Sequence, residues 1–521
     1  MGMKYAVTSQ EMKLYDRNTS EHFGVDTKIL MERASLLVAD AVCDWTKKRG
    51  VDRKYRVLVL SGVGNNGGDA VCAGRLLLQR GFSVSVCIVG DVTKCSDLLL
   101  YQLQIAEKYG IIRNTFPGAC STDRAYEYDI VIDGLFGIGL TRPLSGDCLE
   151  AVKFVNGCRE QRKEDLFVIS VDMPSGVNAD SGAVMGDAIR ADMTVTFNQV
   201  KLGHILYPGC EYKGELIVGD AGITDESFLG REPSAVYFSG DAKELLPPRK
   251  RNSNKGSNGK VLVVAGSKNI SGACILAASA CLRSGAGMVR VFTAAENAEA
   301  VKSLLPEVLL DVYEDFEPVF DGLEEAMNWC TQAVIGPGIG TDGRALEILR
   351  IVLMYCKKSL VMDADALNII ASDPELMKLA QNYSTGGRKL ILTPHMGEFA
   401  RLTNKSIREC KEKVIPLTRE FADRMHATVI SKDARSIVAD SNEKKVYINV
   451  SGNDGMATAG SGDVLAGVLG ALLHLEMSSF EIACAGAYIH GKAGDYAAER
   501  QGRYSMVASD IVESLPDVFE E

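Results

Sequence analysis

Short runs of β-branched and aliphatic residues alternate with longer stretches of helical pattern along most of the chain. Examples are YRVLVLSG at residues 55–62, FSVSVCIVG at 82–90 and LFVISVDMPSG at 166–176. These runs are apolar at consecutive positions rather than at every second position, which is typical of parallel strands buried on both faces. The pattern therefore predicts an α/β protein whose parallel sheets are covered by helices on both sides.

This alternation is interrupted once, between residues 223 and 259. The interruption runs from ITDESFLGREPS to LLPPRKRNSNKGSNG and is polar and rich in proline, serine and asparagine. Strand-like runs resume with KVLVVAGS at 260–267. Because the chain of 521 residues is longer than a typical single domain, a segment of this composition indicates a domain boundary. We place that boundary near residues 225–235, which gives domains at 1–225 and 235–521.

The composition is that of an ordinary soluble protein, with 46% hydrophobic and 24% charged residues and a net charge of −11. An acidic chain of mixed charge is a poor match for nucleic acid or an anionic membrane. The longest apolar run, VLAGVLGALLHL, is too short to span a bilayer, and MGMKYAVTSQEMK has no signal-peptide core. The 14 cysteines form no CxxC pair, as is usual for free thiols in a reducing compartment. We therefore expect a cytoplasmic protein that binds neither nucleic acid nor membrane.

The stretch TAGSGDVLAG at 458–467 is the first candidate for chemistry. Small residues before a helix let backbone N–H groups approach an anion, and the helix dipole favours negative charge there. Ala459 to Gly462 are thus a candidate phosphate cradle. A carboxylate at Asp463 would repel that phosphate unless it accepts a proton from an attacking hydroxyl, which makes it a candidate general base. An equally good interpretation of this stretch alone is that Asp463 caps the helix.

Four further segments of the second half have the same character. They are VVAGSKNISGA at 263–273, VIGPGIG at 334–340, DADAL at 363–367 and LTPHMGE at 392–398. Each follows a predicted strand, and ligands of open α/β sheets bind at the carboxyl ends of the strands. A single glycine turn or histidine is usually structural. Together, the segments predict one shared ligand-binding edge and favour the catalytic interpretation of Asp463.

In this order, and with SKDA at 431–434, the segments resemble the NAD(P)HX dehydratase family, whose fold is ribokinase-like. The resemblance covers roughly residues 235–521. It implies that ADP with Mg²⁺, or ATP in eukaryotic members, drives dehydration of the (6S) hydrate of NADH or NADPH, giving AMP and phosphate. Asp463 would activate the 6-hydroxyl group for phosphorylation. Four other residues would contact the hydrated coenzyme: Gly338, His395, Gly397 and Glu398.

The same resemblance places the ADP on two segments. Its expected contacts are Lys432, Asp433, Ala434, Arg435, Ser436, Asn453, Gly455, Met456, Ala457, Thr458, Ala459, Gly460, Ser461 and Gly462.

In the first half, the turn after the strand at 57–61 reads GVGNNGGDA. Asn65 and Asn66 offer amide oxygens that could hold a hard cation, a ribose or a phosphate, and the neighbouring glycines permit close approach. The alternative is an Asn-Gly turn with Asp69 as a helix N-cap. Later strands end in VIDGLFGIGLTRPLSG and SVDMPSGVNAD, which bring Asp133, Asp172 and other polar residues to the same predicted edge.

With ILMERAS near the start, these segments resemble the NAD(P)HX epimerase family over roughly residues 1–225. The resemblance implies a Rossmann-like three-layer sandwich that binds K⁺ through Asn66, Asp133 and Ser175. The reaction interconverts the (6R) and (6S) hydrates, and Asp172, followed by Asp69, is our candidate for the proton-transferring carboxylate. The expected substrate contacts are Asn65, Asn66, Gly67, Gly68, Asp69, Gly137, Ile138, Gly139, Leu140, Thr141, Arg142, Pro143 and Asp172.

Taken together, the two resemblances predict a bifunctional repair enzyme that acts on small molecules and forms a homo-oligomer. Two alternatives remain at this stage. One is a ribokinase-like small-molecule kinase with a regulatory first domain, which would use the same cradle and base. The other is a non-catalytic binding scaffold, because Rossmann-like sandwiches also occur without activity.

Overall fold

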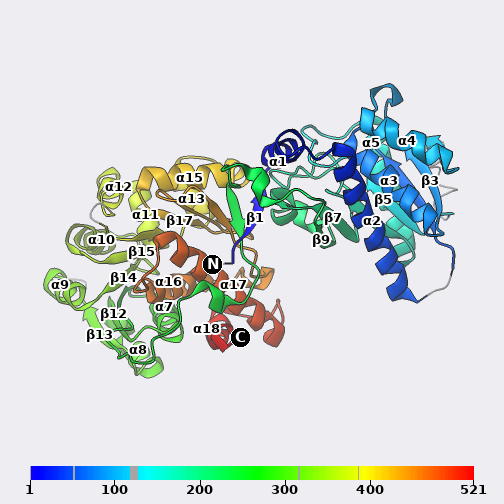
Figure 1. The fold of residues 1–521 in the computed structure, drawn as a ribbon. Coiled ribbons are helices and arrows are strands. Elements are labelled where there is room, and N and C mark those ends of the chain that lie inside the picture. Colours follow the sequence, from blue (N-terminus) through cyan, green and yellow to red (C-terminus); the bar gives the residue numbers. More distant parts are fainter. Residues whose placement is uncertain (1, 51–52, 118–126, 315–316, 385–386, 521) are drawn as a thin grey trace. The chain divides into compact units, whose positions relative to one another are not determined.

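The computed structural model describes residues 2–50, 53–117, 127–314, 317–384 and 387–520. It divides the chain into two compact units, both drawn in Figure 1. Residues 5–234 form the first unit, and residues 235–521 together with residues 1–4 form the second. The first domain therefore continues past residue 225, because Phe228 packs in its core with Met12 and Tyr15. The Tyr15 hydroxyl also donates a hydrogen bond to the carbonyl oxygen of Arg231 at 2.8 Å.

The first domain contains a parallel sheet in the order β4-β3-β2-β5-β6-β7-β9. The strands are β2 (Arg56–Ser61), β3 (Ser83–Ile88), β4 (Ile112–Thr115), β5 (Ile130–Gly134), β6 (Phe167–Val171), β7 (Met193–Phe197) and β9 (Glu215–Gly219). From β2 the chain first builds outward to β3 and β4 and then returns to β5 on the other side. The strand order thus reverses between β2 and β5, which is where ligands bind in open α/β sheets.

Helices cover both faces of this sheet. Alternate strand residues such as Val57 and Val59 pack against α2 (Thr27–Arg49), α3 (Asn65–Gln79) and α4 (Asp97–Lys108). The intervening residues, such as Leu58 and Leu60, pack against α5 (Gly146–Arg162). Burial on both faces explains why the strands are apolar at consecutive positions.

Shorter elements complete the first domain. Residues 5–7 of β1 (Lys4–Val7) belong to the first domain. β1 pairs in parallel with β8 (Val200–Lys201), with Ala6 opposite Val200. The remaining elements are α1 (Ser9–Glu21), α6 (Leu202–Ile205), η1 (Val92–Lys94), η3 (Lys163–Asp165), η4 (Gly209–Glu211) and η5 (Asp225–Phe228).

The second domain has a larger, mixed sheet in the order β13-β12-β11-β14-β15-β16-β17-β18-β19-β10. Its strands are β10 (Ala235–Tyr237), β11 (Lys260–Val264), β12 (Met288–Ala294), β13 (Leu309–Tyr313), β14 (Gln332–Ile335), β15 (Ser359–Met362), β16 (Leu390–Leu392), β17 (Thr428–Ser431), β18 (Ile437–Asp440) and β19 (Val446–Ile448). β18 is antiparallel to both of its neighbours, and the other pairs are parallel.

Helices of the second domain enclose this sheet. The long helices near the end of the chain, α16 (Ser461–Leu472), α17 (Ser479–Gln501) and α18 (Ala508–Glu520), pack together with α7 (Gly272–Arg283). The others are α8 (Ala298–Leu304), α9 (Phe320–Trp329), α10 (Gly343–Tyr355), α11 (Asp365–Ser372), α12 (Pro374–Gln381), α13 (Met396–Thr403), α14 (Ile407–Glu412), α15 (Val414–Met425), η6 (Ala242–Leu245), η7 (Ala295–Asn297) and η8 (Asp454–Met456). Every residue of β14, β16 and β17 is buried, so the central sheet is covered on both faces.

The α/β architecture predicted for both domains is confirmed. Within the described ranges, no helix combines the length and apolar character needed to cross a membrane.

Candidate active sites

In the first domain, the turn after β2 leads directly into α3. The helix begins at Asn65, and its N-cap is Gly64, which has no side chain to cap it. Asp69 therefore lies inside the helix, so the alternative in which it acts as the N-cap is wrong. The glycines are required by close packing, because a Cβ added to Gly67 would lie 2.2 Å from the carbonyl oxygen of Gly62. Asn65 and Asn66 thus stand at the helix N-terminus, above the carboxyl end of β2.

Asp133, the fourth residue of β5, is fully buried. Its carboxylate accepts hydrogen bonds from Ser175 Oγ at 2.5 Å, Ser175 N at 2.9 Å and Ser170 Oγ at 2.8 Å. Burial raises the pKa of Asp133, although these hydrogen bonds act in the opposite direction. A buried carboxylate surrounded by neutral donors has unneutralised charge, which a bound cation could balance.

Asn66 adds to this oxygen-rich region. Its side-chain nitrogen is buried and has no hydrogen-bond partner among the described atoms. A Cβ added to Gly137 would lie 2.9 Å from Asn66 Oδ1 and 3.3 Å from Asp172 Oδ2, so these two side chains meet beside Gly137. In the described part of the chain, no group of three or more His, Cys, Asp or Glu side chains could hold a metal ion. A cation in this region would therefore depend on amide, hydroxyl and carbonyl oxygens as well as on Asp133.

Asp172 immediately follows β6 and has the left-handed backbone angle φ = 65°. The buried Lys201 places its Nζ atom 2.6 Å from Asp172 Oδ1, and Thr196 Oγ1 donates to the same oxygen at 3.0 Å. Burial alone would raise the pKa of Asp172, but the charge of Lys201 and these hydrogen bonds hold it below its usual value. Asp172 is therefore ionised at neutral pH.

His204 fixes the backbone of the same residue. Lys201 N donates to His204 Nδ1 at 3.1 Å, so the proton of the neutral ring is on Nε2. This Nε2 donates to the carbonyl oxygen of Asp172 at 2.8 Å. Burial, reinforced by the charge of Lys201, lowers the pKa of His204 to about 3, so the ring stays neutral. The loop that carries Asp172 is thus held on both its side chain and its backbone.

Asp69 has the opposite electrostatic character. Burial raises its pKa well above the usual value, and the charges of Asp172 and Asp16 add to this effect. The site therefore combines a carboxylate with a lowered pKa, Asp172, and a carboxyl group with a raised pKa, Asp69. Two titratable groups whose pKa values are pushed apart in this way can serve as base and acid.

The loop after β5 contains two kinds of residue. Gly139, Thr141, Arg142 and Pro143 are exposed and available to a ligand. The side chain of Leu140 is buried, and Ile138 packs against the apolar core. Leu140 and Ile138 could therefore contact a substrate mainly through their backbone.

In the second domain, α16 begins at Ser461, and its N-cap is Gly460 with φ = 90°. Asp463 thus lies in the first turn, where a carboxylate also interacts favourably with the helix dipole, and the N-cap itself is Gly460. A Cβ added to Gly460 would lie 2.5 Å from Leu276 Cδ1. The small residues are therefore required both by a left-handed backbone and by tight packing.

The N-terminus of α16 lies next to a lysine–aspartate pair. Lys432 Nζ donates to Asp363 Oδ1 at 2.7 Å, and Asp363 is almost completely buried. A Cβ added to Gly462 would lie 3.0 Å from Lys432 Nζ and 3.5 Å from Asp363 Oδ2. The structure thus brings together SKDA, DADAL and the glycine-rich turn, three segments that are far apart in the sequence.

Asp463 has the electrostatic properties of a base. Burial, followed by the negative charge of Asp363, raises its pKa to about 7, although Lys432 acts in the opposite direction. A general base is most effective when its pKa is close to the working pH. Asp365 also raises the pKa of Asp463, and its Oδ2 accepts a hydrogen bond from Gly340 N at 2.9 Å, which ties GPGIG to DADAL.

His395 and Glu398 form a capping box at the start of α13. Glu398 is buried, and its carboxylate accepts a hydrogen bond from His395 N at 2.9 Å and lies 3.2 Å from His395 Nε2. The His395 ring is more than half exposed and pairs through its backbone with Lys432. His395 is thus available to a ligand beside Lys432, whereas Glu398 positions it. Gly338 lies at the same edge, where an added Cβ would be 2.7 Å from Ile270 Cγ2.

The expected ADP contacts lie on two loops that approach each other. Asp433 and Ala434 are exposed between β17 and β18, and Arg435 donates a hydrogen bond to the Val450 carbonyl oxygen. Asn453 belongs to the other loop and uses its amide nitrogen to hold Gly494 O at 2.9 Å. Asn453 therefore helps to hold the loop that leads to α16.

Several polar residues at these sites were not expected from the sequence. Thr196 lies within the MTVTFN run, on β7, and Lys201 and His204 follow it on β8 and α6. An isolated lysine in a buried segment was the available signal. His490, on α17, lies 3.4 Å from Ser461 Oγ. Burial lowers the pKa of His490 to about 4, so the ring that contacts Ser461 is neutral.

Comparison with known proteins gives a consistent result for both domains. The family model for NAD(P)H-hydrate dehydratase matches residues 261–517, and that for the YjeF-related protein N-terminus matches residues 27–203. The chain is 35% identical to the bifunctional NAD(P)H-hydrate repair enzyme Nnr of Thermofilum pendens, over 99% of this chain and 96% of that protein. The same enzyme of Moorella thermoacetica is 33% identical with the same coverage, and that of Escherichia coli is 31% identical over 88% of this chain and 84% of that protein.

Two solved structures are similar to part of this chain. The ADP/ATP-dependent NAD(P)H-hydrate dehydratase of Bacillus subtilis, co-crystallised with ATP/Mg²⁺, is 25% identical and has a TM-score of 0.46. The match covers 54% of this chain and 95% of that chain. A ribokinase-like superfamily protein of Enterococcus faecalis is 25% identical with a TM-score of 0.46, over 55% of this chain and 95% of that chain.

Proposed function

The chain belongs to the family of bifunctional NAD(P)H-hydrate repair enzymes, and we propose that each of its two sites carries one half of the repair. The family predicted from the sequence motifs is thus confirmed. The enzyme epimerises the hydrates of NADH and NADPH and dehydrates the (6S) form at the expense of ADP. We assign epimerisation to residues 5–234 and dehydration to residues 235–521. Because the relatives named as bifunctional repair enzymes are similar over almost the whole chain, they favour neither the kinase nor the scaffold alternative.

The observation that carries the dehydratase proposal is the environment of Asp463. This residue lies in the first turn of α16, and its pKa of about 7 suits a general base. Asp463 takes the proton of the 6-hydroxyl group, and the oxygen attacks the terminal phosphorus of ADP, so that AMP leaves. The phosphate then leaves with the C6–O electron pair while C5 loses a proton, and the ring double bond reforms. Backbone N–H groups of residues 459–462 and the helix dipole stabilise the phosphate charge.

Mg²⁺ accompanies the ADP in this proposal. Because no cage of three His, Cys, Asp or Glu side chains exists in the described residues, the ion would be held mainly by phosphate oxygens, as is common for Mg²⁺. It would neutralise part of the phosphate charge near Asp363 and Asp463. Lys432 contributes a fixed positive charge at the same place.

For the epimerase site, we propose Asp172 as the base and Asp69 as the acid. C6 of the hydrate carries both the hydroxyl group and the ring nitrogen. Removal of the hydroxyl proton by Asp172 allows the C6–N bond to open, with a proton supplied to nitrogen by Asp69. Reclosure from the other face of C6 inverts the centre and reverses both proton transfers. The low pKa of Asp172 and the high pKa of Asp69 match these roles.

The oxygen atoms of Asn66, Asp133 and Ser175 fit a hard monovalent cation, since Asp133 is fully buried beside neutral partners and Asn66 and Ser175 add an amide and a hydroxyl oxygen. We propose K⁺ as this ion. Its charge would favour a developing oxyanion on the substrate. We also propose a cytoplasmic homo-oligomer, which sedimentation and cell fractionation would test.

The experiment that tests the proposed function measures absorbance at the reduced-nicotinamide band with a mixture of both hydrate epimers. We expect full recovery of reduced coenzyme with ADP and Mg²⁺, because epimerisation feeds dehydration. Recovery that stops at the (6S) share would contradict the epimerase assignment. If neither ADP nor ATP supports any recovery, the dehydratase assignment is wrong.

A further inference from the structure

A cavity of about 600 Å³ lies in the first domain, away from the proposed epimerase site. It is lined by Phe167, Met193 and Glu215, the first residues of β6, β7 and β9. Asp172 lies beyond the opposite end of β6, and Thr196 lies near the opposite end of β7. The cavity and the epimerase site are therefore at opposite edges of one sheet. Its volume is within the usual range of small-molecule sites.

One wall of the cavity is aromatic. Trp45 of α2 stacks on Phe167, with ring centroids 4.1 Å apart and planes 14° apart. The guanidinium carbon of Arg49 lies 4.6 Å from the centroid of the Trp45 ring. Phe167 is buried, whereas Trp45 is half-buried and keeps part of its indole accessible. Phe167 and Arg49 cover the two faces of the indole and hold it in place, so its accessible part is the ring edge, which can make an edge-to-face contact with a planar ring.

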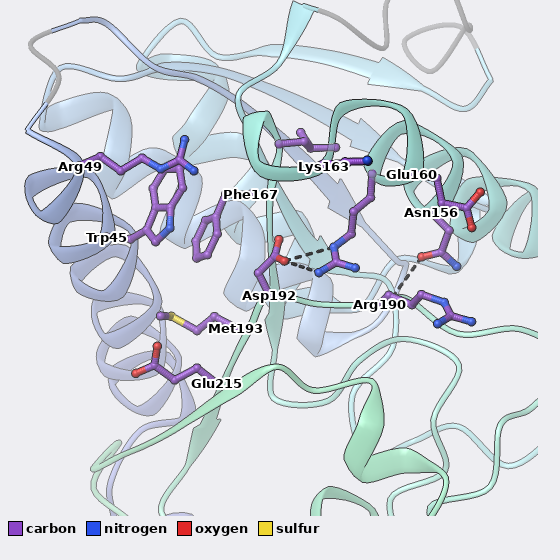
Figure 2. A pocket seen from close by; sticks show the side chains of 12 residues that line it. Trp45, Arg49, Asn156, Glu160, Lys163, Phe167, Arg190, Asp192, Met193 and Glu215 are labelled. Carbon is purple, nitrogen blue, oxygen red and sulfur yellow. Dashed lines mark hydrogen bonds and ion pairs between the residues drawn. The ribbon is translucent and has the colours of Figure 1, made fainter. Parts of the chain in front are cut away.

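The facing wall is polar and rigid. Arg159 is hydrogen-bonded through Nε and a terminal nitrogen to Asp192 Oδ1, and Asp192 Oδ2 accepts from Val168 N at 2.8 Å. Asn156 accepts a hydrogen bond from Arg190 N at 3.1 Å. Figure 2 shows Trp45 and Phe167 on one side and Lys163, Asp192 and Arg190 on the other. Because this wall is already held by hydrogen bonds, a ligand would not have to order it.

The cavity lining has a small excess of basic side chains, although the chain as a whole is acidic. Its lining contains four basic side chains, Arg49, Arg159, Lys163 and Arg190, and the acids Glu160, Asp192 and Glu215. Arg159 and Asp192 neutralise each other, so the remaining basic groups outnumber the acids on a chain with a net charge of −11. Lys163 and Arg190 are exposed at the cavity, and Lys163 has a backbone angle, φ = 48°, that is unusual for a residue with a side chain.

We propose that this cavity is a binding site for a small organic anion with a planar ring, of the class of nucleoside monophosphates. The ligand ring packs against the accessible edge of the Trp45 indole, and the anionic group lies near Lys163 and Arg190. Arg159 and Asp192 form the fixed wall between them. The site is distinct from both active sites, since none of the residues assigned to epimerisation or dehydration lines it.

The chain contains only two tryptophans, Trp45 and Trp329. In the full-length Trp329→Phe variant, Trp45 is therefore the sole source of indole fluorescence. We expect a saturable change in this fluorescence, and in the indole N–H resonance, on titration with adenosine monophosphate. Nicotinamide mononucleotide tests whether another base is accepted. Adenosine alone and inorganic phosphate alone should bind more weakly than the nucleotide, because each offers only one of the two interactions.

Substitutions in the same background locate the anion. Lys163→Gln and Arg190→Gln should each weaken binding roughly tenfold through loss of one charged contact. The control is Lys153→Gln, an exposed lysine on α5, the helix that ends just before Lys163; Lys153 does not line the cavity, so this variant should leave binding unchanged. The proposal is overturned if neither fluorescence nor the indole resonance responds to either nucleotide. It is also overturned if Lys163→Gln and Arg190→Gln bind as tightly as Lys153→Gln.

Discussion

At the scale of single residues, both proposed sites depend on carboxylates whose pKa values are set by neighbours distant in sequence. Asp463 acquires its raised pKa from burial and from Asp363. Asp172 has a lowered pKa because Lys201 outweighs the effect of its burial. Each of these features leads to a measurable consequence.

The first prediction concerns Asp463→Asn. We expect ADP-dependent dehydration to fall by about 10²–10⁴-fold, the usual contribution of a general base. Epimerisation and the unfolding transition should stay unchanged, because the amide has the same size as the carboxyl group. The variant is assayed with pure (6S) hydrate for dehydration and with one pure epimer for epimerisation. Dehydration at the wild-type rate would exclude Asp463 as the base.

The second prediction concerns pH. The base must be ionised to accept a proton, and the pKa of Asp463 is about 7. The dehydration rate at saturating substrate should therefore rise as pH increases through about 7 and then level off. Lys432→Met should move this midpoint to higher pH, because Lys432 lowers the pKa of Asp463. A midpoint that does not move in Lys432→Met would mean that another group controls the profile.

The third prediction concerns Lys201→Met. Removing the buried partner of Asp172 leaves a carboxylate without a counter-charge, so we expect a loss of roughly 3 kcal/mol in the stability of the first domain. The pKa of Asp172 should rise, so the pH profile of epimerisation should shift to higher pH. Urea unfolding and the pH–rate profile measure the two effects. The exposed Lys48→Met serves as a control, and an unchanged pH profile in Lys201→Met would assign Lys201 a purely structural role.

At the scale of elements, the site of the second domain is built at the start of α16. Gly460 has a left-handed backbone, and Gly462 packs against Lys432 and Asp363. A small residue is therefore needed at each position for a different reason. The helix itself is ordinary and buries most of its residues.

The fourth prediction tests this helix start. Gly462→Ala would place a methyl group 3.0 Å from Lys432 Nζ, at the entrance to the cradle. We expect a higher KM for ADP, with at most a small loss of stability because the lysine end is flexible. Gly272→Ala, also at a helix start but with no neighbour within 4 Å of the added Cβ, is the control. An equal KM for ADP in both variants would show that Gly462 does not border the nucleotide.

At the scale of the whole molecule, the two activities are joined in one chain with separate cores and separate sites. Joining the activities ensures equal amounts of both, and dehydration removes the (6S) epimer that epimerisation replenishes. Nothing in this arrangement requires the substrate to pass directly from one site to the other.

The fifth prediction follows from that independence. An equimolar mixture of Asp172→Asn and Asp463→Asn should convert mixed epimers completely, because released (6S) hydrate diffuses between molecules. Each variant alone should leave part or all of the hydrate unrepaired. Incomplete recovery by the mixture, with both remaining activities at normal rates, would contradict free exchange of the intermediate.

Much of the site could be predicted from the sequence because glycine-rich turns and aspartates directly follow apolar strands. Asn66 and Asp133 became candidates in this way, and the structure places them at the carboxyl ends of β2 and β5. Asp463 became a candidate because of the small residues before it, and it lies in the first turn of α16. Lys201 and His204 could not be predicted from the sequence. Both contact Asp172, which is about 30 residues away, and nothing in the residues around them indicates that contact. Glu398 was expected to face the substrate, yet its carboxylate is buried on His395.

The sequence by itself determined the α/β class of both domains, their approximate boundary and the family, and it proposed the loops of the candidate sites. These properties depend on local patterns, since apolar runs specify buried strands and glycines specify tight turns. Only the tertiary structure decided which charges meet: Lys432 with Asp363 beneath α16, and Lys201 with Asp172 beyond β6. The pKa of each carboxylate proposed as a base depends on such distant neighbours and on burial, and the residues next to it in the sequence reveal neither.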